Sequence, residues 1–188
     1  MQVCEKAVEE TSAGRNAWER MASEYVVCFV CTGNTCRSPM AAALLNDMAE
    51  RGERLELPNR TNGQADLHIR AVSAGLFAQE GMPISDHAVA VLEKAGIENT
   101  ETNPYRSHKA RQIREETVRK ADLVIGISST HAQMLRTAFP NQADKICALP
   151  YDVSDPFGGD EKTYAQCLDQ LTAAIRTMFV PAEGGETV

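Results

Sequence analysis

The chain has 188 residues, of which 43% are hydrophobic and 24% are charged, and its net charge is −7. This length suits one domain, and the composition excludes collagen-like, coiled-coil and largely disordered proteins. The negative charge argues against nucleic-acid or anionic-membrane partners, and with neither a ~20-residue apolar run nor an apolar signal-peptide core we expect a cytoplasmic protein.

The first predicted strand marks the start of a domain. Residues 1–24 are polar and are interpreted as an appended segment, helical or partly disordered. Residues 25–30 are continuously apolar and rich in β-branched side chains, which is typical of a strand buried on both faces of a parallel sheet. We therefore predict an N-terminal extension over 1–24, a catalytic domain over 25–180 and a C-terminal tail over 181–188.

Helices and strands alternate along the rest of the chain. A helix is predicted from Ser38, with Ser38 as the N-cap and Pro39 at the first helical position. Residues 51–66, rich in Pro, Asn and Gly, predict a long loop. The later predicted elements are strands near 67–72, 123–127 and 146–149, and helices over 86–95, 113–120, from Ser129 to before Pro140, and about 164–178. Ser129 is expected to be the N-cap of its helix. This alternation predicts an α/β, three-layer fold, a four-stranded parallel sheet with helices on both faces, whose ligands bind at the carboxyl ends of the strands.

The loop after the first strand, residues 31–39, reads Cys-Thr-Gly-Asn-Thr-Cys-Arg-Ser-Pro. A strand that turns into a helix directs backbone N–H groups inward and forms an anion site at the positive end of the helix. Gly33 and Asn34 are the residues that best tolerate the left-handed backbone of such a turn. Because these N–H groups and Arg37 favour a thiolate, we predict that Cys31 is a nucleophile. Arg37 offers a planar, charged fork for two phosphate oxygens.

The remaining side chains of the loop suggest supporting roles. The Ser38 hydroxyl can donate to the Cys31 sulfur, and Thr32 and Thr35 are expected to line the loop or its rim. Cys36 has two interpretations, a small filler of the loop or the partner of Cys31 in a reversible disulfide that protects the nucleophile.

The other cysteines predict no metal site. Cys28 and Cys31 have the spacing of half a zinc site or of a redox pair, but Cys28 belongs to the buried run, and no second pair completes four ligands. We expect no metal and no organic cofactor. Cys4, Cys147 and Cys167 are interpreted as apolar fillers, and a chain with this much apolar sequence needs no disulfide framework.

The run V-C-T-G-N-T-C-R-S-P resembles the phosphate-binding loop of the low-molecular-weight protein tyrosine phosphatases and of the similar bacterial protein arginine phosphatases. The likeness covers about residues 25–179 and includes four further segments, 72–75, 107–112, 121–124 and 155–159. The first 24 residues and part of the loop 51–66 exceed the compact family pattern, so their roles stay open.

The resemblance implies a two-step hydrolysis through a phosphocysteine. Cys31 would be the nucleophile, Arg37 the phosphate clamp and Asp155 the general acid that protonates the leaving group and then activates water. Asp152 and Asp160 compete with Asp155 for this role because all three carboxylates lie close in sequence.

The resemblance also implies supporting residues. Asn34 and Ser38 would hold the loop through hydrogen bonds in which Ser73 and His108 join, and Phe157 would form a wall of the pocket. None of these roles follows from composition or spacing alone.

The substrate is the finer question. Many tyrosine-directed members of this family carry a bulky aliphatic residue and a second aromatic where this chain has Thr35 and Gly158. The resemblance therefore implies that phosphoarginine in proteins is the substrate. Inorganic phosphate would be the product of the hydrolysis. Phosphotyrosine is the alternative. Arsenate reduction would need resolving cysteines, which residues 75–120 lack, and a phosphate-binding module without turnover would need neither Cys31 nor Asp155.

Overall fold

The computed structural model describes residues 24–57 and 68–180. Within them the chain forms one parallel sheet with the strand order β2-β1-β3-β4. Its elements are β1 (Glu24–Cys31), α2 (Arg37–Glu50), β2 (His68–Gly75), α3 (Asp86–Lys94), η1 (Tyr105–Ser107), α4 (Glu115–Lys120), β3 (Leu123–Gly126), α5 (Ser129–Ala138), η2 (Pro140–Lys145), β4 (Ile146–Ala148) and α6 (Glu161–Phe179). The predicted N-terminal extension apart from Glu24, which begins β1, lies outside the described residues, as do the C-terminal tail and most of the loop 51–66. The domain boundaries therefore stay predictions.

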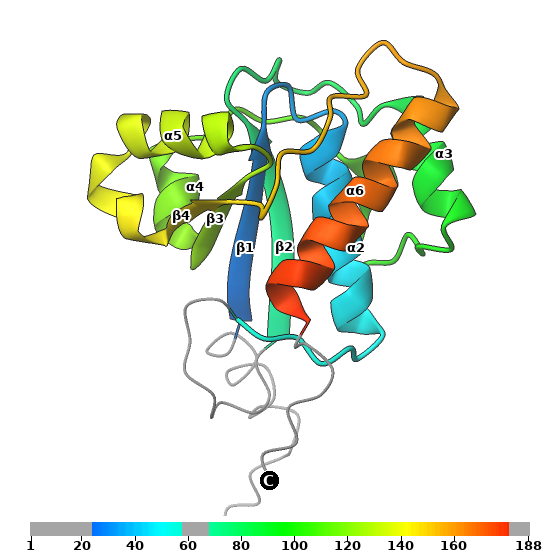
Figure 1. Ribbon diagram of the computed structural model, residues 1–188, viewed down its shortest axis with the longest axis horizontal. Helices are drawn as coiled ribbons and strands as arrows, with labels where there is room; N and C mark the ends of the chain where they lie inside the picture. Colours follow the sequence, from blue (N-terminus) through cyan, green and yellow to red (C-terminus); the bar gives the residue numbers. More distant parts are fainter. Residues whose placement is uncertain (1–23, 58–67, 181–188) are drawn as a thin grey trace, which may run out of the picture.

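Helices cover both faces of the sheet. Figure 1 shows α2, α3 and α6 on one side of the strands and α4 and α5 on the other. The buried apolar side chains accordingly form two clusters, one on each face. The predicted three-layer α/β fold with a four-stranded parallel sheet is confirmed. Within the two described stretches, no helix has the length and apolar character needed to cross a bilayer.

The central strand β1 explains why its sequence is apolar throughout. Val27 and Phe29 contribute to the cluster beneath α2 and α6, whereas Cys28 and Val30 contribute to the cluster beneath α4 and α5. All four side chains are fully buried. Because successive side chains of a strand point to opposite faces, a strand covered on both sides needs apolar residues at every position.

Two predicted helix N-caps, Ser38 and Ser129, were wrong. Helix α2 begins at Arg37 with Cys36 at the N-cap, and Ser38 lies inside the first turn, where its hydroxyl makes tertiary contacts instead of capping. Helix α5 is capped by Ser128, whose hydroxyl accepts a hydrogen bond from the His131 N–H. A local pattern of Ser and Pro does not reveal which hydroxyl is used elsewhere in the fold.

Strand β2 runs three residues further than predicted, and its end supports the loop after β1. The N–H groups of Leu76 and Phe77 donate to the carbonyl oxygens of Cys31 and Thr32, both at 2.9 Å. A Cβ atom added at Gly75 would lie 2.7 Å from the Thr32 carbonyl oxygen. Glycine at this position therefore lets the two segments approach each other.

Candidate active site

A pocket of about 230 Å³ lies at the carboxyl end of β1, where the fold class places ligands. Seven of its lining residues run from the last residue of β1 to the first residue of α2, and two come from the segment before α6. The lining residues are Cys31, Thr32, Gly33, Asn34, Thr35, Cys36, Arg37, Asp155 and Phe157. The predicted loop, acid and wall residues thus meet in one place.

The Cys31 sulfur lies at the base of this loop and is 3% exposed. The Asn34 N–H donates to Cys31 Sγ at 3.3 Å, and the Ser38 hydroxyl lies 3.0 Å from the same sulfur. Ser38 is also 3.2 Å from the Ala74 carbonyl oxygen, so its single proton has two acceptors. When the sulfur carries a negative charge, the charged acceptor forms the stronger hydrogen bond.

Asn34 ties the loop to two neighbouring segments. It is fully buried, and its φ of 58° is the only positive value among the described non-glycine residues. Its Nδ2 group donates to the hydroxyls of Ser38 and Ser73, both at 2.9 Å, and its Oδ1 atom accepts from the Arg111 N–H at 2.9 Å. The left-handed backbone was therefore predicted correctly for Asn34 and wrongly for Gly33.

His108 holds the same residue from the other side. Its Nε2 atom donates to the Asn34 carbonyl oxygen at 2.8 Å. Burial lowers the pKa of His108 below 6.5, although the hydrogen bond to Asn34 opposes this shift. His108 is therefore a neutral support of the loop near neutral pH.

Arg37 and Asp155 form an ion pair at the pocket. Arg37 Nη2 donates to Asp155 Oδ2 at 2.5 Å, and Nη1 lies 3.5 Å from the Val153 carbonyl oxygen. The Arg37 side chain is 9% exposed, whereas that of Asp155 is 50% exposed. The guanidinium is thus fixed inside the loop, and the carboxylate faces the opening.

The two competing carboxylates are engaged elsewhere. Asp152 accepts hydrogen bonds from the N–H and the hydroxyl of Ser129 at the start of α5. Asp160 caps α6 and accepts from the N–H and hydroxyl of Thr163, and these hydrogen bonds lower the pKa of Asp160. Of the three, Asp155 alone lines the pocket.

Thr35 and Phe157 shape the opening. Thr35 lines the pocket from the loop, and Phe157, which is 78% exposed, lines it from the segment before α6. Gly158 has a φ of 79°, which by itself favours glycine. The absence of an aromatic side chain at 158 is accounted for by this backbone conformation, so the argument about substrate depends on Thr35.

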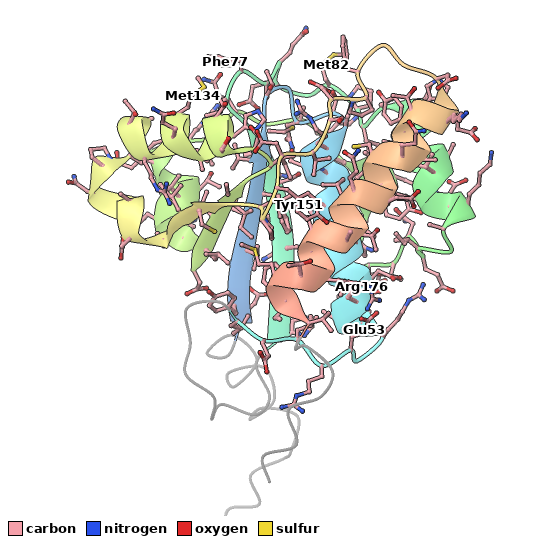
Figure 2. The ribbon with its side chains drawn as sticks, viewed as in Figure 1. Glu53, Phe77, Met82, Met134, Tyr151 and Arg176 are labelled. Atoms are coloured by element: carbon pink, nitrogen blue, oxygen red, sulfur yellow. The ribbon has the colours of Figure 1, made fainter. Side chains whose placement is uncertain are left out.

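Other exposed apolar side chains lie toward the same end of the molecule. Figure 2 labels Phe77, Met82 and Met134 at the end where the strands terminate, whereas Glu53 and Arg176 pair at the opposite end. Phe77 is 65% exposed, although its backbone N–H donates a hydrogen bond to the Thr32 carbonyl oxygen in the loop. Of the exposed large apolar side chains, Phe157 lines the pocket itself, and Phe77 and the two methionines lie at the same end of the molecule.

Cys36 lines the pocket and also contacts the buried side chain of Tyr164. Its sulfur lies 3.1 Å from the Tyr164 hydroxyl, which accepts a hydrogen bond from the Ser85 hydroxyl at 3.0 Å. Burial raises the pKa of Cys36, and burial with the bond to Cys36 raises the pKa of Tyr164 to about 12. A disulfide between Cys31 and Cys36 stays a prediction.

The remaining described cysteines are free thiols. Cys28 faces the cluster under α4 and α5, away from Cys31, and burial raises its pKa to about 12. Cys147 is partly buried and Cys167 is buried. Within residues 24–57 and 68–180, no three His, Cys, Asp or Glu side chains gather closely enough to hold a metal ion.

One residue at the site was missed by the sequence analysis, which gave His131 no role. Its Nε2 atom lies 3.0 Å from the Thr32 hydroxyl, and its Nδ1 atom lies 2.8 Å from the Ser128 hydroxyl. The available signal was a histidine three residues after a serine that follows a buried strand. Only the fold brings this helix start next to the loop.

Comparison with known proteins gives the same family at the levels of sequence and structure. Residues 26–185 match the profile of the family described as low molecular weight phosphotyrosine protein phosphatase. The protein-arginine-phosphatase of Geobacillus stearothermophilus is 37% identical over 158 residues, which cover 80% of this chain and 91% of the relative. The structure of a low molecular weight protein tyrosine phosphatase from T. tengcongensis is 36% identical, with a TM-score of 0.66 and coverage of 80% and 95%. A YwlE arginine phosphatase mutant with a phosphorylated active site serine is 33% identical, with a TM-score of 0.65 and coverage of 80% and 91%.

A parallel α/β sheet with a cysteine, an arginine and a carboxylate in one pocket at the strand ends fits a thiol-based phosphatase. The chain belongs to the low-molecular-weight phosphotyrosine protein phosphatase family. It is therefore a cysteine-dependent protein phosphatase, which acts through a phosphocysteine intermediate.

Proposed function

We propose that this phosphatase hydrolyses phosphoarginine side chains of proteins, with Cys31 as nucleophile, Arg37 as phosphate clamp and Asp155 as general acid. The observation that carries the assignment of roles is the single pocket in which these three side chains meet. Phosphorylated proteins are the partners, inorganic phosphate is the product, and the cytoplasm is the expected location.

The reaction proceeds in two displacements. The Cys31 sulfur attacks phosphorus, the bond from phosphorus to the leaving atom breaks, and the Asp155 carboxyl gives that atom a proton. The Asp155 carboxylate then takes a proton from water, which attacks the phosphocysteine and releases phosphate with the Cys31 thiolate. The Ser38 hydroxyl, 3.0 Å from the sulfur, stabilises the departing thiolate. Arg37 donates hydrogen bonds to the phosphoryl oxygens in both steps.

The preference for phosphoarginine is supported by Thr35. Its hydroxyl lines the pocket and can hydrogen-bond to the guanidinium of the substrate or to the attacking water, whereas an aliphatic side chain would pack on a phenyl ring. The relative from Geobacillus stearothermophilus, which is named a protein-arginine-phosphatase, adds support.

Phosphotyrosine is the second candidate. The exposed Phe157 ring at the opening could pack on a phenyl ring, and the relative from T. tengcongensis is named a tyrosine phosphatase. Both substrates are compatible with this family of phosphatases. The two candidates differ only in which phosphorylated side chain the pocket binds better.

A substrate panel tests the proposal. Parent protein and a Thr35→Ile variant are compared on matched peptides carrying phosphoarginine or phosphotyrosine, and kcat/KM is measured for each. We expect the parent to prefer phosphoarginine and Thr35→Ile to shift the ratio toward phosphotyrosine by about tenfold or more, the scale of one hydrogen bond to a charged group. An unchanged ratio would remove the role of Thr35. A Cys31→Ser variant that released phosphate at the parent rate would contradict the assignment of Cys31 as the nucleophile.

A further inference from the structure

We propose that His131, oriented by Ser128, is a positioning residue that holds the Thr32 hydroxyl as a hydrogen-bond donor toward the phosphoryl oxygens of the substrate. The proposal rests on the proposed function because it assigns a further contact within the same pocket. It concerns a histidine outside the loop, on the helix that follows β3.

The platform for His131 is firmly built. A Cβ atom added at Gly126 would lie 2.5 Å from the Ala132 nitrogen, so the first turn of α5 sits directly on the end of β3. Asp152 holds the same turn by accepting from the Ser129 N–H at 2.7 Å and from its hydroxyl at 3.1 Å. His131 itself is only 7% exposed. The imidazole is therefore placed by a helix, a strand and a carboxylate together.

The contacts of Ser128 fit the neutral tautomer of His131 that the proposal requires. Within the described residues its hydroxyl oxygen has two partners, both in His131, namely the backbone N–H at 3.2 Å and Nδ1 at 2.8 Å. A backbone N–H can only donate, so Ser128 accepts there, and in the proposed arrangement its own hydrogen points at Nδ1. A neutral imidazole with an acceptor at Nδ1 carries its hydrogen on Nε2.

The Nε2–H group then determines what Thr32 can do. Nε2 lies 3.0 Å from Thr32 Oγ1, and with its hydrogen on Nε2 the histidine donates while the threonine oxygen accepts. The hydrogen of the Thr32 hydroxyl is left for another acceptor, and Thr32 lines the pocket. In the opposite tautomer Thr32 would donate to His131 and turn its lone pairs toward an anionic phosphoryl group, which is repulsive.

The charge around the ring agrees with a neutral histidine. Burial lowers the pKa of His131, and the nearby Arg37 guanidinium lowers it further, while Asp155 and Asp152 oppose the shift. A neutral His131 can donate from Nε2 while it accepts at Nδ1. We call this chain of hydrogen bonds, from the His131 backbone N–H through Ser128 and the imidazole to Thr32, the relay.

A double-mutant cycle tests the relay. Thr32→Val and His131→Phe each remove one end of the bond with little change in shape, and Thr32→Ser keeps the hydroxyl. The readouts are kcat/KM on an aryl phosphate and the inhibition constant of inorganic phosphate. We expect each single variant to lose about tenfold in both readouts, as for one hydrogen bond to a charged group, and the double variant to lose no more than either single one. Thr32→Ser should stay near the parent.

Several outcomes would overturn the proposal: a Thr32→Val variant with parent-like phosphate inhibition, a His131→Phe variant with parent-like inhibition, or losses that multiply in the double variant. A nitrogen NMR spectrum of the imidazole is independent of catalysis, and a proton on Nδ1 near neutral pH would equally refute it. His68→Phe, at the far end of β2, is the matched control for the substitution itself, and urea unfolding checks that every variant is folded. If His131→Phe does not fold, Ser128→Ala replaces it in the cycle with the same expected result.

The two proposals fail separately. If the parent does not turn over phosphoarginine peptides, the proposed substrate is lost, but aryl phosphate turnover, phosphate inhibition and the NMR signal still report on the relay. If those three contradict the relay while Cys31→Ser abolishes turnover, the phosphatase mechanism stands without it.

Discussion

Asp155 and Arg37, 118 positions apart in the chain, form an ion pair at 2.5 Å across the mouth of the pocket. The pair brings a carboxyl group that can exchange a proton next to the group proposed to hold phosphate. The pair also distinguishes Asp155 from Asp152 and Asp160, because the hydrogen bonds of these two carboxylates stabilise the starts of helices.

Replacing Asp155 with Asn should slow the first displacement. We expect kcat on a phosphoarginine peptide to fall by about 10²–10⁴-fold, the usual contribution of a positioned general acid, because the leaving guanidine needs a proton. The loss should be smaller on an aryl phosphate with an electron-withdrawing ring, whose leaving group departs unprotonated. Steady-state kinetics on both substrates measure the difference.

Asp160→Asn is the matched control for this carboxyl-to-amide change. Asn caps a helix about as well as Asp, so we expect parent-like rates and stability. Equal losses for Asp155→Asn on the two substrates would contradict an acid role, and an effect of Asp160→Asn on kcat would point to a different carboxylate.

Asn34 carries both a backbone requirement and three side-chain hydrogen bonds, and two substitutions separate these effects. Asn34→Gly keeps the left-handed backbone but loses the bonds to Ser38, Ser73 and Arg111. We expect it to lower the free energy of unfolding by about 3 kcal/mol, since buried partners lose their hydrogen bonds. Asn34→Ala should lose about 1 kcal/mol more because of its positive φ. Urea unfolding measures both values, and an Ala variant more stable than the Gly variant would contradict this division.

The apolar runs predicted the sheet well because burial on both faces leaves a continuous signal in the sequence. Of the site, the sequence predicted the loop residues but not the contact made by His131. Cys31 and Arg37 lie in one short loop, so their approach is local, whereas His131 reaches Thr32 across 99 positions, and no local pattern encodes that distance. The prediction of Ser38 as an N-cap was wrong for the same reason, because its hydroxyl contacts Ala74 on β2, which is distant in the sequence.

The stability of the fold should depend on pH through His108. Because burial lowers its pKa below 6.5 in the folded protein, the unfolded chain takes up the proton first as the pH falls. The contribution of His108 is therefore fully present above about pH 6.5 and is lost as the pH falls from there toward the lower pKa of the folded state. We expect His108→Gln to lose less stability than the parent between pH 7.5 and about pH 5, relative to each protein's own value at pH 7.5.

Urea unfolding at a series of pH values measures this difference, and the comparison removes the carboxylates that both proteins share. His68→Gln serves as the control, because His68 is exposed at the start of β2. Identical pH profiles for parent and His108→Gln, or a parent that gains stability on acidification through this range, would contradict the neutral, buried state of His108.

The contact between Gly75 and the loop after β1 leads to a steric prediction. A Cβ atom at this position would lie 2.7 Å from the Thr32 carbonyl oxygen and 3.0 Å from the Asn34 nitrogen, both of which are backbone atoms. Gly75→Ala must therefore displace the loop, and we expect a loss of about 2 kcal/mol in the free energy of unfolding together with a fall in kcat/KM. At Gly33 an added Cβ would meet only Thr35 Oγ1, at 3.8 Å, so Gly33→Ala should change the free energy of unfolding by less than about 0.5 kcal/mol. Urea unfolding of the two variants tests the contrast, and equal losses of stability would mean that β2 does not support the loop in the way described.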